Sequence, residues 1–382
     1  MTFGNRKLQD ALRVAHLWLG VGAGIFIVMM GLSGTVIIFR SQIEASVAPR
    51  TAHAIAAGSA RLSAVAKSLD TLRPGARITR VTFPDTADGP LLVQADSAGK
   101  KGMLLYFDPS TGQALGEKPT VAWLDWLVDL HQNLLSGKTG RAWAGLIGVA
   151  LLLVSSSGLF SWLAGSRDWK RTLAMPQKGA WRRVNFQAHK WAGLWTNVLL
   201  IVVSFTGMVL AWPDTFQWAI RTATSEHTAV AQTLPKRSGK SFLPLDDYVH
   251  AAAATLPGGV VKELRLPGRG SNAVSLTVRA SGDLRRKGSN IVLLDPVSAK
   301  VISVERASAA PLSVKFVELA NAIHKTELGG LPVQLVWSLL GLAPALLFVS
   351  GLGIWWQRRS ARRVLVPATN HAMARRTKTA AG

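Results

Sequence analysis

Apolar and mixed segments alternate along the chain. Four apolar segments are long enough to cross a hydrocarbon layer of roughly 30 Å, which takes about 20 helical residues; they run over 17–39, 142–164, 192–212 and 333–356. The two long segments between them, 41–140 and 213–331, combine short amphipathic helical patterns with alternating strand-like runs. The pattern predicts an α-helical membrane protein with four transmembrane helices and two small α+β modules outside the membrane.

The cations indicate on which side of the membrane each segment lies. The chain holds 44 Lys and Arg against 21 Asp and Glu, a formal net charge of +23, although 48% of its residues are hydrophobic. The cations concentrate before the first span, in the link 166–190 and in the tail 358–382, whereas the long segments mix both signs. By the positive-inside rule both termini and the link are cytoplasmic and both modules are external. The charge therefore implies contact with membrane lipids, and we expect no nucleic-acid partner.

The two halves of the chain repeat each other. Aligning His16 with His189 also matches three further positions: Trp18 with Trp191, Gly20 with Gly193, and Ser-Gly at 33–34 with Thr-Gly at 206–207. Both external segments carry a turn that opens with Asp-Pro, in YFDPSTGQALGE at 106–117 and in LLDPVSAKVISVE at 293–305. Because both halves begin with a span that runs outward, we predict two parallel repeats, related by an axis along the membrane normal.

These observations divide the chain into eight predicted parts. In chain order they are the cytoplasmic N-terminus with the first span (1–40), a module with an interfacial helix (41–140), the second span (141–165), a basic cytoplasmic link (166–190), the third span (191–212), a second module with an interfacial helix (213–331), the fourth span (332–357) and a basic cytoplasmic tail (358–382).

Four histidines lie at repeat-related positions near the span ends. We place His16 and His189 at the cytoplasmic edge, and His131 and His324 at the external edge. Any one of them alone could be an interfacial polar residue, but ionisable groups at membrane depth are usually functional. The two edges are separated by roughly 30 Å of hydrocarbon, so His16 and His131 cannot share one iron. The pairs consistent with the repeat are His16 with His189 and His131 with His324, which predicts two bis-imidazole haem b sites.

The absence of cysteine narrows the chemistry of these sites. A chain with no Cys excludes disulfides, cysteine-ligated iron–sulfur clusters and covalently attached c-type haem. A haem-ligating histidine also needs an acceptor for its second ring nitrogen, and the sequence identifies none.

Glycines accompany the first histidine of each half. Gly20 and Gly24 follow His16 at four-residue spacing, and Gly193 follows His189 in the same way. Such a face could accept a flat porphyrin ring, or the glycines could instead permit close helix–helix packing.

Cationic and outlying residues give further candidates. Arg13 and Arg141 are candidates for binding haem propionates, with the alternative that they only fix topology. His53 and His227 lie at similar distances after the first histidine of their halves and are weaker candidates for a ligand or a substrate contact. The basic run 279–290 either attracts an anionic chelate or is simply solvated.

Together these motifs resemble the PepSY-associated transmembrane family of iron-regulated bacterial inner-membrane proteins. The resemblance covers almost the whole chain and rests on HLWLG, HKWAG, LHQNLLSGKTGR, IHKTELGG and the DPSTG turn. Within that family the chain is most similar to siderophore reductases such as the one for ferrioxamine uptake. The resemblance implies two b haems, ligated by His16, His131, His189 and His324, and reduction of ferric siderophore in the periplasm. The second turn departs from the pattern, because DPVSAK lacks the glycine of DPSTG.

The function that we expect is therefore a haem-dependent ferric-siderophore oxidoreductase. Siderophores, here of the hydroxamate type, hold the hard Fe(III) ion through oxygen ligands, and reduction to Fe(II) weakens that hold. The sequence shows neither a hydrolase motif nor a convincing dinucleotide fingerprint, so the electron donor is a quinol or a separate reductase. Two alternatives are a non-enzymatic periplasmic binding or regulatory protein and a ferric-chelate importer; the importer is disfavoured by spans without Asp or Glu.

Overall fold

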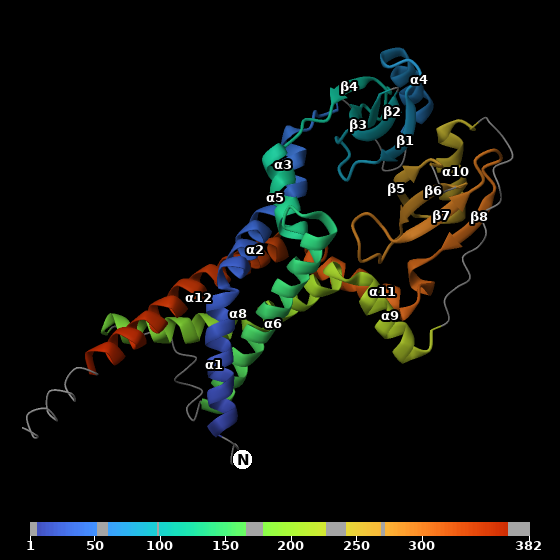
Figure 1. Ribbon diagram of the computed structural model, residues 1–382. Helices are drawn as coiled ribbons and strands as arrows, with labels where there is room; N and C mark the ends of the chain where they lie inside the picture. Colours follow the sequence, from blue (N-terminus) through green and yellow to red (C-terminus); the bar gives the residue numbers. More distant parts are fainter. Residues whose placement is uncertain are drawn as a thin grey trace, which may run out of the picture. The chain divides into compact units, whose positions relative to one another are not determined.

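The computed structural model describes residues 6–51, 60–97, 99–165, 179–226, 242–268 and 272–365. The chain divides into two compact units. The helical unit comprises Met1–Ile38, Asp125–Trp212 and Leu331–Gly382, and the sheet unit comprises Phe39–Leu124 and Pro213–Gly330. Figure 1 labels the helices of the first unit and the strands of the second.

Within its described residues, the helical unit contains three helices long and apolar enough to cross a membrane. They are α6 (Gly137–Gly165), α8 (Trp181–Ala211) and α12 (Gly330–Leu365). Two shorter helices, α1 (Arg6–Gly22) and α2 (Gly24–Ile37), pass the same test only as a pair, and they are bent by 62° where they meet. The first span predicted over 17–39 thus corresponds to the end of α1 and the whole of α2, with a bend between them that the sequence did not predict. Glycines at 20, 22 and 24 explain the bend, because glycine is a poor helix former and offers no side chain to support the turn.

The third apolar helix begins earlier than its hydropathy suggests. Helix α8 starts at Trp181, so the last ten residues of the predicted link 166–190 are helical and His189 lies well inside a helix. The polar first turns of α8 extend the apolar span without interruption, and hydropathy alone does not detect them. Residues 166–178 lie outside the described ranges.

The sheet unit is built on one antiparallel sheet rather than two. Its eight strands lie in the order β4-β3-β2-β1-β5-β6-β7-β8, and they are β1 (Arg77–Thr82), β2 (Leu91–Ser97), β3 (Lys100–Phe107), β4 (Ala114–Glu117), β5 (Val260–Arg265), β6 (Val274–Arg279), β7 (Asn290–Leu294) and β8 (Val301–Glu305). Each predicted module supplies four consecutive strands. They join where β1 pairs with β5, with Val81 opposite Leu264.

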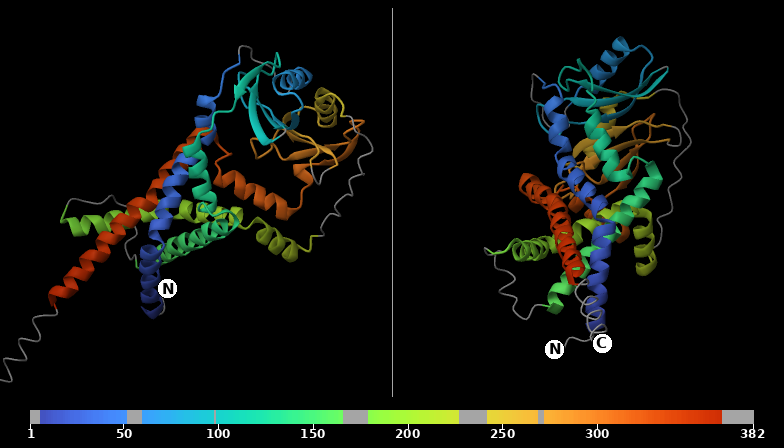
Figure 2. Two further views of the ribbon diagram at one scale, coloured as in Figure 1. Left: turned by 45° about the horizontal axis from the view of Figure 1, so that its top comes forward. Right: turned by 60° about the vertical axis from the view of Figure 1, so that its left-hand side comes forward.

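One hydrophobic core underlies both modules. Helices α4 (Leu62–Leu72) and α10 (Leu245–Thr255) bury their apolar faces among the inward residues of the sheet. The ribbons of both helices lie beside the sheet in Figure 2. Leu69, Tyr248 and Leu276 are all almost completely buried. The Asp246 carboxylate accepts hydrogen bonds from the N–H groups of Leu62 and Ser63 and so caps α4 from the other module. The two modules therefore fold as one body.

The two Asp-Pro turns have the same construction despite the lost glycine. Asp108 accepts from the N–H groups of Ser110 and Thr111, and Asp295 accepts from those of Val297 and Ser298. The fifth residue has positive φ in both turns, +74° at Gly112 and 53° at Ala299. The aspartate anchors therefore hold the second turn in a backbone conformation that its alanine disfavours.

Shorter helices complete the two units. Helix α5 (Ala122–Asn133) leads into α6, while α3 (Arg40–Val47), α9 (Pro213–Thr224) and α11 (Leu312–His324) belong to the sheet unit. Phe216 of α9 stacks on Phe316 of α11 with ring centroids 6.4 Å apart. The Glu226 carboxylate just after α9 accepts from the N–H groups of Leu312 and Ser313 and caps the start of α11.

Candidate functional site

His16 of α1 and His189 of α8 face each other inside the helical unit. Their ring centroids are 6.4 Å apart and their planes are nearly perpendicular, at 87°. Two imidazoles that ligate one metal ion from opposite sides have similarly separated rings, because each metal–nitrogen bond takes about 2 Å and each ring nitrogen lies about 1 Å from its ring centre. The structure thus brings together the inner pair that the repeat predicts, at a spacing that one iron ion fits.

The hydrogen bonds of His16 define its tautomer. Its Nδ1 lies 3.0 Å from the carbonyl oxygen of Val154 and 3.2 Å from Oγ of Ser157, both on α6. A carbonyl oxygen can only accept, so Nδ1 must carry the proton and donate it. The lone pair of this neutral imidazole is therefore on Nε2, the nitrogen that remains for a metal ion.

The Nδ1 atoms of His189 and His131 also have hydrogen-bond partners, in both cases the hydroxyl oxygen of a serine. Nδ1 of His189 lies 2.8 Å from Oγ of Ser350 on α12, and Nδ1 of His131 lies 2.9 Å from Oγ of Ser33 on α2. Each hydroxyl hydrogen has a partner on its own helix, at the carbonyl oxygens of Leu346 and of Met29 respectively, both 2.7 Å away. With the hydroxyl hydrogens on these carbonyls, the serine oxygens are placed to accept from Nδ1–H, in the tautomer that leaves the lone pair of each histidine on Nε2.

A glycine follows each of these serines and lies beside the imidazole. A Cβ atom added at Gly158, Gly34 or Gly351 would lie 3.1, 3.3 or 3.4 Å from Cε1 of the corresponding histidine. Three Ser-Gly pairs, at 33–34, 157–158 and 350–351, thus contact three histidines. The sequence analysis used the pair at 33–34 only as a mark of the repeat. The signal that could have found the others is the recurrence of a hydroxyl residue followed by Gly in every apolar segment.

The fourth histidine belongs to the other unit. His324 is the last residue of α11 in the sheet unit, whereas His131 belongs to the helical unit. The pairing of His131 with His324 stays a prediction from the repeat.

The three glycines proposed to lie against the porphyrin, Gly20, Gly24 and Gly193, differ in the space around them. Nothing lies within 4 Å of a Cβ added at Gly20, and only Leu347 lies within that distance at Gly193, at an ordinary 3.7 Å. At Gly24 the added atom would be 2.3 Å from the ring of Phe348. Gly24 also lies beyond the bend, so it does not extend the face of His16. The alternative interpretation, close helix packing, applies to Gly24, while Gly20 has the space that a bulky group requires.

The predicted propionate partners lie on the surface of the helical unit. Arg13 pairs with Asp10 of its own helix at 3.2 Å, and both side chains are exposed. Arg141 donates from Nε to Oδ1 of Asn133 at 3.1 Å, two residues after His131. Arg141 is therefore hydrogen-bonded to a residue that lies two positions after the candidate ligand His131. His53 and His227 lie outside the described residues.

A strained turn connects α5 to α6 immediately after His131. Leu134 and Leu135 have φ of 46° and 57°, a left-handed conformation that bulky residues seldom adopt. Gly140 lies so close to the carbonyl oxygen of Asn133 that an added Cβ would be 1.6 Å from it. Strain of this kind persists where the surroundings fix the backbone, often at functional sites.

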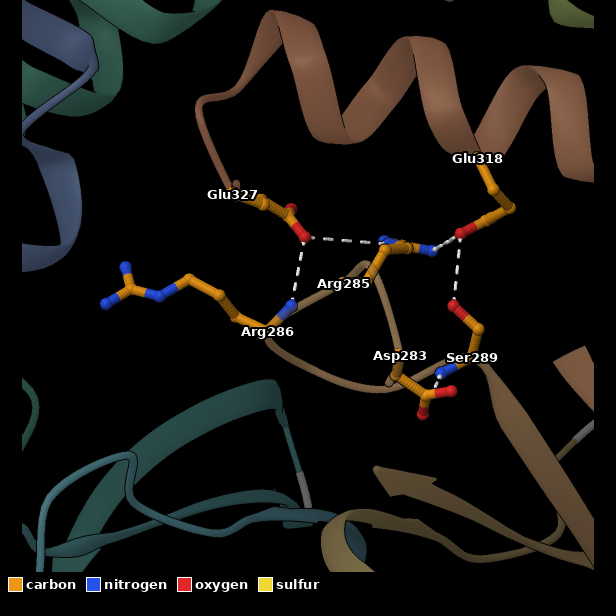
Figure 3. Close-up of polar contacts among 6 residues, drawn as sticks. All are labelled: Asp283, Arg285, Arg286, Ser289, Glu318 and Glu327. Carbon is orange, nitrogen blue, oxygen red and sulfur yellow. Dashed lines mark hydrogen bonds and ion pairs between the residues drawn. The ribbon is translucent and has the colours of Figure 1, made fainter. Parts of the chain in front are cut away.

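The basic run 279–290 is partly neutralised within the sheet unit. Nη1 of Arg285 lies 3.0 Å from a Glu318 carboxylate oxygen of α11, and the carboxylate of Glu327 accepts from the N–H of Arg286 at 3.2 Å (Figure 3). The side chains of Arg286 and Lys287 are exposed. The run is therefore attached to the helix that ends at His324, and part of its charge remains available to solvent.

Comparisons with known proteins agree with the membrane character of the helical unit. The family model described as PepSY-associated TM region matches residues 13–358. A Pseudomonas aeruginosa protein, whose name reads only "Uncharacterized protein PA4219", is 28% identical over 260 residues, which cover 62% of this chain and 64% of that protein. The chain therefore spans less than two thirds of the length of this relative.

Proposed function

Since this chain belongs to the PepSY-associated TM family, we propose that it is a di-haem b reductase of the bacterial inner membrane. It carries electrons outward and reduces a ferric siderophore, of the hydroxamate type, in the periplasm. The observation that carries the proposal is the His16–His189 pair, with facing rings 6.4 Å apart and Nδ1 of each bound to a neighbouring helix.

The residues around this pair fit a haem better than a metal ion that several side chains would have to coordinate. Within the described ranges, no group of three or more His, Cys, Asp or Glu side chains could hold a metal ion. Two neighbouring imidazoles with protonated Nδ1 atoms would each offer Nε2 to the iron of a b haem, and the open space at Gly20 is on the same helix as His16. Bound haem supplies one-electron chemistry.

The chain's own residues hold and orient the site. His16 and His189 would ligate the haem iron, while the Val154 carbonyl and the hydroxyls of Ser157 and Ser350 hold the imidazole protons at Nδ1. The outer haem is proposed on the repeat, with His131 and His324 as ligands and the Ser33 hydroxyl holding the proton of His131.

The reaction needs one electron for each ferric ion. A quinol or a separate reductase supplies it on the cytoplasmic side, and the siderophore-bound Fe(III) becomes Fe(II). The weaker oxygen contacts of Fe(II) then let the metal leave. Both termini are cytoplasmic in this proposal, and the exposed Arg286 and Lys287 make the sheet unit a surface that attracts anionic groups.

The test is an absorption spectrum of the detergent-purified full chain, before and after dithionite, with pyridine haemochrome quantification. We expect two b haems per chain with low-spin α and β bands on reduction. His16→Ala or His189→Ala should each remove one haem, and His131→Ala or His324→Ala the other. His250→Ala, an exposed position of α10, is the matched control and should retain both. A protein that stays haem-free despite ample haem supply would overturn the proposal and favour a binding or regulatory role.

A further inference from the structure

Every histidine of the helical unit that we propose as a ligand rests on a Ser-Gly pair of another helix. Ser157–Gly158 of α6 contacts His16, Ser350–Gly351 of α12 contacts His189, and Ser33–Gly34 of α2 contacts His131. In each case the serine oxygen is near Nδ1 and the glycine is near Cε1. Three occurrences of the same two contacts, on three different helices, indicate one recurrent arrangement.

The serine in this arrangement acts as an acceptor. A hydroxyl has one hydrogen and two lone pairs. In Ser33, Ser157 and Ser350 that hydrogen is directed to a carbonyl of the serine's own helix, at 2.7, 2.9 and 2.7 Å. The oxygen then accepts Nδ1–H from the histidine. An acceptor at this position fixes the ring orientation and increases the basicity of the ligating nitrogen.

The glycine supplies the space in which the ring lies. A Cβ contact of 3.1–3.4 Å is tighter than ordinary van der Waals separation, so any larger residue would rotate the imidazole away from its serine. A hydroxyl acceptor and a missing side chain at adjacent positions together allow one ring orientation.

We propose, on the premise of the proposed function, that Ser33, Ser157 and Ser350 are positioning residues for the haem ligands and set the potential of the haem iron. The two inner histidines are held alike. His16 lies 3.0 Å from the Val154 carbonyl as well as near Ser157, and His189 has a backbone hydrogen bond with Leu347 as well as its contact with Ser350. Because each imidazole keeps a main-chain partner, loss of Ser350 and loss of Ser157 should affect their haem to a similar extent.

The experiment compares serine variants of the full chain by redox titration of the α band, low-spin electron paramagnetic resonance and haem retention. Ser350→Ala should raise the midpoint potential of one haem, because a less basic imidazole stabilises Fe(III) less well. It should also weaken haem retention by roughly 10- to 100-fold, the usual range for such partners. Ser157→Ala should change the same haem in the same direction by a similar amount, and Ser33→Ala should change only the other haem.

Controls separate positioning from folding. Ser350→Thr keeps the hydroxyl and should restore the wild-type potential, and Ser156→Ala, at an exposed position beside Ser157, should change nothing. Gly158→Ala should alter the resonance signature of the inner haem while leaving the serine in place. If the wild type holds two haems but Ser350→Ala leaves both potentials and haem content unchanged, the inference is overturned and the proposed function stands. A haem-free wild type overturns the proposed function itself.

Discussion

The first membrane segments of the two halves differ in shape although their histidines align. Helices α1 and α2 are bent by 62°, whereas α8 runs without a break from Trp181 to Ala211. Two of the three glycines at the bend are absent from α8, where Trp195 and Asn197 stand in place of Gly22 and Gly24. Both histidines nevertheless reach the same meeting point. The two halves therefore place their aligned histidines alike, although the helices that carry these histidines follow different paths.

The partners of the two inner histidines, by contrast, are alike. Nδ1 of His16 lies beside a main-chain carbonyl and a serine of α6, and His189 has a backbone hydrogen bond with Leu347 and contacts a serine of the same helix, α12. The carbonyl of Ser350 is also held by Nδ2 of Asn185 at 3.0 Å. Both histidines thus rely on one main-chain and one serine partner.

The Asp-Pro turns offer the largest expected difference between the halves. Gly112→Ala should destabilise the sheet unit by about 2–4 kcal/mol, since a left-handed alanine costs about 1–2 kcal/mol and the new Cβ would be 2.5 Å from that of Ala64. Ala299→Gly should stabilise it by up to about 1 kcal/mol. Hydrogen exchange of β3 and β7 amides in the full chain measures both. Equal and small effects would show that the two turns do not differ.

The glycines of the bent span should respond in opposite directions. Gly24→Ala forces the ring of Phe348 to move and should cost about 1–3 kcal/mol. Gly20→Ala meets no neighbouring atom and should stabilise the helix by about 0.5–1 kcal/mol. Thermal unfolding of the detergent-solubilised chain, in the absence of added haem, compares the two. A destabilised Gly20→Ala protein would contradict the open space at that position.

The repeat also makes a prediction for α8. Thr206–Gly207 aligns with Ser33–Gly34, and the Thr206 hydroxyl hydrogen is directed to the carbonyl of Val202 at 2.8 Å, as in the serines. We expect Thr206→Val to raise the midpoint potential of the haem that Ser33→Ala affects. Thr206→Ser is the matched control and should behave as wild type. A shift in the other haem would break the correspondence between the halves.

The smallest effect concerns the helix that ends at His324. Hydrogen bonds from Ser313, and then from Leu312, lower the pKa of Glu226. The ionised carboxylate therefore stabilises α11 at pH values above the pKa that Glu226 has in the unfolded chain. This contribution is lost as the pH falls through the lower pKa of Glu226 in the folded protein. The protection factor of the Leu312 amide should therefore decrease on acidification, and Glu226→Gln should remove that dependence. Helix α5 of the first half has Asp125 in its own first turn, so it should not respond to Glu226→Gln.

The sequence patterns predicted those features of the fold that depend on the average composition of a long segment. The apolar runs located the membrane helices, and strand alternation with the Asp-Pro turns located most of the sheet. The bend at residue 23 was missed because hydropathy does not report direction, and the polar start of α8 because hydropathy falls there.

The partners of the histidines could not be predicted because they depend on helix packing. Nothing local to Ser157 indicates that His16 contacts it across 141 residues. The pairing of β1 with β5 is equally non-local, so two expected modules became one sheet. Arg285, expected in a run that is either solvated or substrate-binding, is paired with Glu318 instead.

The β1–β5 junction also constrains the order of events during synthesis. Strand β1 ends at Thr82 and its partner begins at Val260, so about 180 residues, among them two apolar helices, are made between them. At ribosomal rates of roughly 5–20 residues per second, the edge of the first module stays unpaired for about 10–40 s. During that interval the strand has an open edge that another chain could pair with. The second half of the chain therefore covers the edge of β1 only late in synthesis. Any delay in the insertion of the second half lengthens the time for which this edge is exposed to aggregation and proteolysis.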